Sequence, residues 1–111
     1  MSANRTLLLC LGLLVTTLAV ADDVGYKTVA QALAAVKQMK DVSFSTVRGW
    51  TIVTDETHLT VWSFAPQTDP SYPAVVKRMV ISTGSGSKVT LGVLCEAKQA
   101  ACDNLVREFK K

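Results

Sequence analysis

The hydrophobic pattern of this chain begins with an apolar run, residues 7–20, which contains no charged residue and follows a positive charge at Arg5. The run ends in the small-x-small sequence Ala19-Val20-Ala21, which is typical of a signal-peptidase cleavage site. A helix that spans a bilayer takes about 20 apolar residues, whereas this run has about 14. We therefore expect residues 1–21 to be a signal peptide and residues 22–111 to form a single domain, with no membrane span left after cleavage.

Helical spacing occurs at both ends of this expected domain. Thr28 and Gln31 match the capping box that begins many helices, and the apolar stripe that follows predicts a helix over residues 29–40. Residues 22–27, which precede it, are expected to be a mobile lead-in. Near the C-terminus, one apolar helix face is made by Cys102, Leu105, Val106 and Phe109, at positions i, i+3, i+4 and i+7.

Between the two helices, polar and apolar residues alternate with the period of two that is typical of half-buried strands. The pattern predicts about five strands, over residues 42–47, 50–54, 59–64, 74–83 and 88–95. The spacing within residues 74–81 also fits a helix face, but the β-branched residues of this segment favour a strand. All three prolines lie between residues 65 and 73, which predicts a loop.

Short connections between neighbouring strands force antiparallel pairing. The chain is thus predicted to be an α+β domain with an N-terminal helix, an antiparallel sheet of about five strands and a C-terminal helix. We expect both helices to pack on one face of that sheet, because a sheet buries one face against a helical layer.

The cysteines add a covalent constraint. Removal of residues 1–21 leaves Cys95 and Cys102, and an even count in an exported chain favours a disulfide. In one continuous helix their Cα atoms would lie about 10 Å apart, beyond the limit of about 7 Å that a disulfide allows. Cys95 is therefore expected at the end of the last strand, so that the bridge ties this strand to the C-terminal helix. The six intervening residues argue against a redox-active pair.

The composition excludes several functions. With 49% hydrophobic residues and a net charge of +3, the chain is not expected to be disordered, and 12 basic against 9 acidic residues argue against a nucleic-acid binder. A single histidine, His58, leaves no four-ligand metal set. The glycines of residues 84–88 suggest a phosphate loop, but the strand predicted after them favours a hairpin turn. We expect no metal, no cofactor and no nucleic acid.

Three hypotheses of function remain, one of which is a structural accessory with no ligand beyond its own dimer partner. The first is a non-enzymatic protein that binds a protein, an envelope component or a small ligand, with contacts from residues in or near the proline loop: Trp62, Tyr72, Lys77 and Arg78. The alternative is a small hydrolytic enzyme that uses His58 with Asp55 or Glu56 as an acid–base pair. No Gly-x-Ser-x-Gly nucleophile motif accompanies that pair, which favours the binding hypothesis.

Five short segments, residues 49–53, 62–66, 73–78, 93–97 and 100–103, give the chain a family resemblance. Together they resemble a family of small, uncharacterised exported proteins of Gram-negative bacteria, some of which are labelled J-domain-like chaperones. A J domain needs His-Pro-Asp, whereas His58 is followed by Leu59 and Thr60, so that label does not fit this sequence. The resemblance implies a bacterial protein that is periplasmic or secreted, and it adds no catalytic residue.

Overall fold

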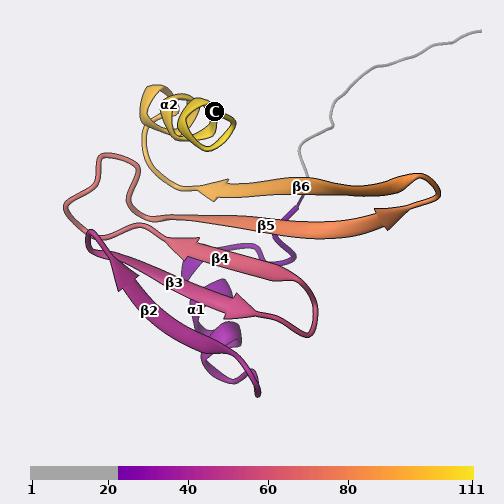
Figure 1. The fold of residues 1–111 in the computed structure, drawn as a ribbon. Coiled ribbons are helices and arrows are strands. Elements are labelled where there is room, and N and C mark those ends of the chain that lie inside the picture. The colour runs from indigo at the N-terminus through magenta and orange to yellow at the C-terminus, as the bar shows by residue number, and fades with distance from the viewer. Residues whose placement is uncertain (1–22) are drawn as a thin grey trace, which may run out of the picture.

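The computed structural model describes residues 23–111, so the expected signal peptide, residues 1–21, lies outside the described residues. Five antiparallel strands form one sheet, and two helices accompany it (Figure 1). The elements, in chain order, are α1 (Val29–Lys37), β2 (Ser43–Val47), β3 (Trp50–Asp55), β4 (Thr60–Phe64), β5 (Ala74–Thr83), β6 (Gly86–Cys95) and α2 (Gln99–Phe109). The α+β class and the antiparallel five-stranded sheet are confirmed.

The strands follow one another in the sheet in the order β2-β3-β4-β5-β6. Three of the connections are short turns, and the longer loop 65–73 joins β4 to β5. At the two-residue turn Arg48-Gly49, both residues have positive φ, 52° and 86°, as a type I′ hairpin requires. The ambiguous segment 74–81 is a strand: Val76 is paired with Val93 of β6. Beyond the pair Thr60–Met79, however, β5 pairs only with β6, and the two strands extend past β4 as a hairpin (Figure 1).

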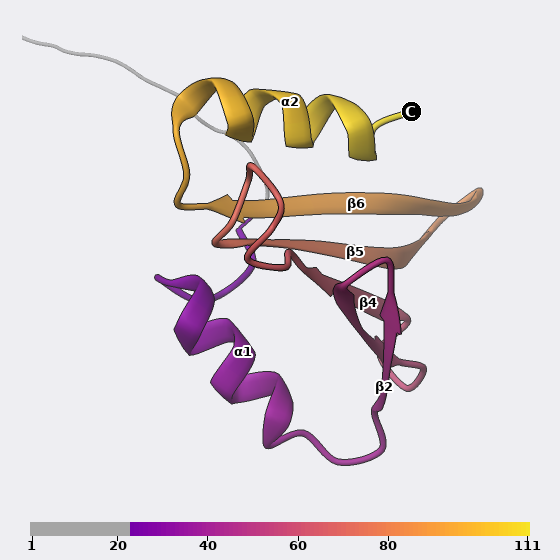
Figure 2. The ribbon, with the colours of Figure 1, turned by 90° about the vertical axis from the view of Figure 1, so that its left-hand side faces the viewer.

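The expectation that both helices lie on one face of the sheet is wrong. Val53, Trp62 and Val75 pack with α1 in one core cluster, whereas Val76 packs with Leu105 of α2 in another. Since Val75 and Val76 are consecutive in β5, their side chains point to opposite faces of the sheet. Both are fully buried, so each face needs its own cover. Figure 2 shows α1 and α2 far apart, with β5 and β6 between them.

The predicted disulfide is confirmed. Cys95, the last residue of β6, is bonded to Cys102 in the first turns of α2, and their Cα atoms are 5.7 Å apart. Between the two cysteines, Glu96 accepts a hydrogen bond at 2.8 Å from the backbone N–H of Val29, the first residue of α1. The connection from β6 to α2 therefore touches both helices, although the helices lie on opposite faces of the sheet.

The lead-in to α1 is also part of the core, contrary to the expectation that it is mobile. Val24 is only 2% exposed and belongs to the core cluster of α1. Tyr26 packs against the same cluster, at a ring distance of 6.1 Å from Trp62. The segment thus lies along the α1 side of the sheet before the helix begins. No helix within residues 23–111 is long and apolar enough to cross a membrane.

Candidate functional site

A cavity of about 520 Å³ opens on the α1 side of the sheet, and we call it the α1-side cavity. Its walls come from four parts of the chain: the lead-in, the residues just after α1, the turn between β3 and β4 with the strand ends that flank it, and the middle of β4 and β5. The apolar part of the lining includes Val24, Tyr26, Met39, Trp62 and Met79. Its volume falls within the range of about 300–1,000 Å³ that is usual for small-molecule sites.

One wall of the cavity is a stack of an amine and two aromatic rings. Trp62 is 3% exposed and is fixed in the core cluster of α1, with the ring of Tyr26 tilted against it at 50°. The Nζ atom of Lys77, on the neighbouring strand β5, lies 4.9 Å from the centroid of a Trp62 ring. This is cation–π distance, so the ammonium group is held against the aromatic face. Within residues 23–111, Lys77 forms no ion pair.

At the rim, Asp55 and His58 form a hydrogen-bonded pair within the turn between β3 and β4. The Nδ1 atom of His58 lies 2.8 Å from Oδ2 of Asp55, and the backbone N–H of His58 donates to Oδ1 at 3.2 Å. These hydrogen bonds stabilise the carboxylate, so the pKa of Asp55 is lowered from its ordinary value of 3.8, against the smaller opposing effect of burial. Asp55 is therefore ionised at neutral pH.

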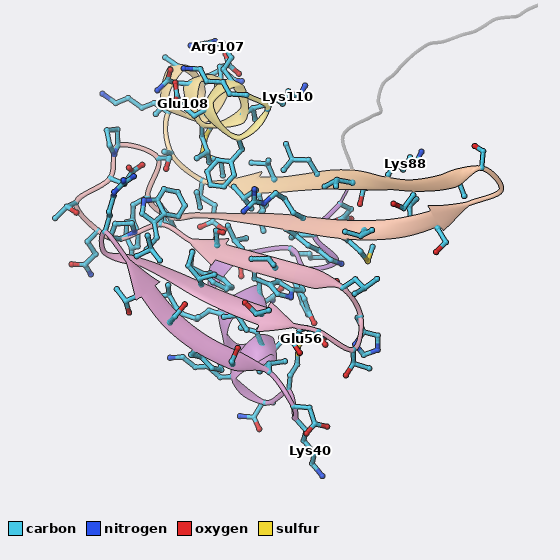
Figure 3. The ribbon with its side chains drawn as sticks, in the orientation of Figure 1. Lys40, Glu56, Lys88, Arg107, Glu108 and Lys110 are labelled. Carbon is cyan, nitrogen blue, oxygen red and sulfur yellow. A yellow bond between two sulfur atoms is a disulfide. The ribbon has the colours of Figure 1, made fainter. Side chains whose placement is uncertain are left out.

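The acid–base pair is thus present, but only with Asp55. The imidazole of His58 is exposed, with 74% of the side-chain surface accessible. Among the described residues, the only side chain that hydrogen-bonds to the ring is Asp55, so no serine, threonine or cysteine is aligned as a nucleophile. Thr60, two residues further along the chain, donates to the backbone carbonyl of His58 instead. Glu56, the other proposed partner of His58, is exposed on the turn (Figure 3).

The four candidate contact residues do not form one site. Trp62 and Lys77 line the α1-side cavity. Arg78 faces the opposite side of the sheet, with its guanidinium 5.6 Å from the ring of Phe109 in α2. Tyr72 is 42% exposed in the loop between β4 and β5, and it lines neither the α1-side cavity nor the hollow beside Arg78.

That hollow on the other face has a volume of about 420 Å³. It lies between the sheet and α2, where Trp50 packs against Phe109 at a ring distance of 5.7 Å. Arg48 and Arg78 line it together with Glu108. The two tryptophans of the chain therefore lie on opposite faces of the sheet, and Trp62 alone belongs to the larger cavity.

Several cavity residues were not predicted from the sequence, among them Tyr26, Met39 and Met79. Tyr26 lies in the lead-in, and the apolar residues Val24 and Tyr26, two positions apart, were the available signal that this segment packs on the core. The methionines carry no local signal of this kind, because they look like ordinary core residues. Their flexible thioether chains suit a wall that adapts to a bound molecule.

Comparisons with protein-family models, with curated proteins and with solved structures give no match for this chain. Among residues 23–111, no three or more histidine, cysteine, aspartate and glutamate side chains group closely enough to hold a metal ion. The geometry of the α1-side cavity is thus the basis for a functional conclusion.

Proposed function

We propose that this chain is a non-enzymatic bacterial binding protein that holds a small ligand in the α1-side cavity. The observation that carries the proposal is the cavity itself, which has an aromatic floor in Trp62, two methionines in its wall and an ammonium group, Lys77, held at the ring. A concave, mostly apolar site with a few polar groups is the usual form of a ligand pocket.

We further propose that the protein works outside the cytoplasm, in the periplasm or after secretion. The leader pattern of residues 1–21 and the resemblance to exported proteins support this location. The Cys95–Cys102 bridge supports it too, because such bonds persist in oxidising compartments. The protein or envelope partner expected from Tyr72 and Arg78 remains a second part of the binding hypothesis, separate from the cavity.

Binding is favoured over catalysis by the surroundings of the imidazole. A histidine that acts as a base needs a reacting group within hydrogen-bond reach, and His58 has only Asp55. The Asp55–His58 pair is nevertheless the one observation that favours the alternative, a small hydrolytic enzyme. A His58→Ala variant separates the two, because loss of a measured hydrolysis would support the enzyme, whereas unchanged ligand binding supports the present proposal.

The direct test uses an uncharged fluorescent probe, N-phenyl-1-naphthylamine, whose emission rises in apolar surroundings. We expect the protein to bind it in the cavity, and we expect Met79→Trp, which fills the cavity, to weaken binding at least tenfold. Val89→Trp is the matched control, because Val89 is 63% exposed and faces the other side of the sheet. Circular dichroism checks that both variants fold. Equal binding by the wild type and Met79→Trp would contradict the proposal.

A further inference from the structure

We propose that the ligand of the α1-side cavity is an organic anion, an acidic group carried on an apolar body. This inference rests on the proposed function and adds the chemical class of the ligand. It follows from the charges that line the cavity: two cations, Lys77 and Lys40, against one carboxylate, Asp55, which is already hydrogen-bonded to His58.

The cation at the aromatic wall of the cavity is Lys77. Its ammonium group has three N–H donors, and the face of the Trp62 ring contacts the ammonium from one side only. Lys77 lines the cavity, and no carboxylate of residues 23–111 lies within ion-pair distance of it; Asp23, which lines a neighbouring hollow with Lys77, makes no ion pair with it. Lys77 is half-buried, so solvent screens the attraction between its ammonium group and an anion less than it would at an exposed lysine.

The carboxylate of Asp55 does not cancel this charge. Both of its oxygens accept hydrogen bonds from His58, one from the backbone and one from the ring. Its charge is therefore stabilised within its own turn. Lys40 adds a second positive charge at the rim, where its side chain extends away from the body of the protein (Figure 3).

The aromatic wall excludes the opposite ligand class. An aromatic ring beside a pocket can bind a quaternary ammonium group, but the Trp62 face is already covered by the Lys77 ammonium. A second cation at this ring would meet like charge. The apolar wall of Tyr26, Met39 and Met79 requires that the anion also carry an apolar body, since simple inorganic anions would leave this surface uncovered.

The test compares two probes that share one body. N-Phenyl-1-naphthylamine is uncharged, and 1-anilinonaphthalene-8-sulfonate is the same molecule with one sulfonate. In a Trp50→Phe background, Trp62 is the only tryptophan left, so energy transfer from it reports a probe bound near the cavity. We expect the sulfonate to bind about tenfold more tightly, the factor that one charge-assisted hydrogen bond supplies.

Variants at Lys77 assign this preference to one group. Lys77→Met keeps the length of the side chain and should abolish the preference for the sulfonate while the uncharged probe still binds. Lys77→Arg should retain the preference, because it keeps the charge. Lys88→Met is the matched control, since Lys88 lies on the hairpin away from the cavity (Figure 3) and should leave both affinities unchanged.

Competition then distinguishes the two common sources of such an anion, a carboxylate and a phosphate ester. We expect 1-naphthoate and 1-naphthyl phosphate to displace the sulfonate probe, and the stronger competitor identifies the acidic group. Equal affinity for the charged and uncharged probes, or a preference that survives in Lys77→Met, would overturn this inference and leave the proposed function standing. If neither probe binds near Trp62, the proposed function itself fails.

Discussion

At the scale of single residues, the carboxylate of Asp55 has two roles: it stabilises the turn between β3 and β4, and it lies at the rim of the α1-side cavity. The side chain holds the backbone N–H of His58, which fixes the turn between β3 and β4, and it holds the imidazole at the same time. Thr60 closes the turn from the other side by donating to the His58 carbonyl. A polar cluster that resembles a catalytic pair in sequence is therefore explained by turn structure.

Asp55→Asn should lower the free energy of unfolding at pH 7 by about 1 kcal/mol, because a neutral amide replaces the charged acceptor of the two His58 hydrogen bonds. Because the pKa of Asp55 is lowered in the folded protein, its stabilisation is complete above the ordinary value of 3.8 and is lost as pH falls through the lower folded pKa. Urea denaturation from pH 7 to pH 2 should show the difference between wild type and variant vanish on acidification.

Glu56→Gln provides the control for this pH series. Glu56 is the neighbouring acid on the same turn and is exposed, so its removal should leave stability nearly unchanged across the range. A difference between wild type and Asp55→Asn that is the same at pH 7 and pH 2 would show that the carboxylate charge is not what stabilises the turn.

At the scale of elements, the disulfide is a main attachment of α2 to the sheet, because the helix buries few side chains. Leu105 is the one residue of α2 that is buried, and no side chain caps the start of the helix at Lys98. Phe109 adds its contact with Trp50 at the far end of the helix. The helix is thus fixed at its first turns by a covalent bond and along its length by two apolar contacts.

The double variant Cys95→Ala with Cys102→Ala should lose about 2–3 kcal/mol of stability, the chain-entropy value for a closed loop of about eight residues. The amide hydrogens of α2 should exchange faster in it, while those of β3 and β4 should keep their relative protection. Hydrogen-exchange mass spectrometry measures both. As a control, a reducing agent should destabilise the wild type and have no effect on the double variant.

The sheet and the disulfide could be predicted from the sequence, whereas the positions of the two helices could not. Strand alternation, turn residues and cysteine spacing predicted the sheet, its antiparallel order and the disulfide, since each is a local pattern. The face of the sheet on which each helix packs is not determined by a local sequence pattern. It depends on Ala74, Val75 and Val76, which are all buried, so that the start of β5 needs cover on both faces.

The candidate site was harder to predict for the same reason. Trp62 and Lys77 were named from the sequence, but as neighbours of the proline loop, whereas cross-strand pairing places Lys77 beside Trp62 over the middle of the sheet. Tyr72 and Arg78 lie elsewhere because one is in the loop and the other, adjacent to Lys77 in β5, points to the opposite face. A one-residue step in a strand changes the face, and no composition pattern shows which face carries a cavity.

At the scale of the whole molecule, one sheet carries two core clusters. The cluster of α1 includes Phe64 and Val75, and the cluster of α2 includes Ala65 and Val76, the next residues along the same strand or just beyond it. The two clusters are therefore joined through the backbone of β4 and β5. We expect them to unfold together, as is usual for a single domain of this size.

Leu105→Ala tests this coupling, and it should lower the free energy of unfolding by about 2–4 kcal/mol. In the Trp50→Phe background, Trp62 reports the α1 side while the substitution lies on the α2 side. The urea midpoint from Trp62 fluorescence should fall as far as the midpoint from circular dichroism. Asn104→Ala, on the exposed side of α2, is the control. If the Trp62 midpoint does not move, the two faces unfold independently.

The overhanging end of the β5–β6 hairpin offers a practical opening for engineering. Past Met79 this ribbon touches no third strand, and a Cβ added at Gly84 in its tip would meet no atom within 4 Å. Isolated two-stranded ribbons contribute little to stability. An inserted peptide, a dye or a surface anchor should therefore be accepted at this tip while both cores and the cavity stay intact, which makes it the natural handle for immobilising the protein in ligand screens.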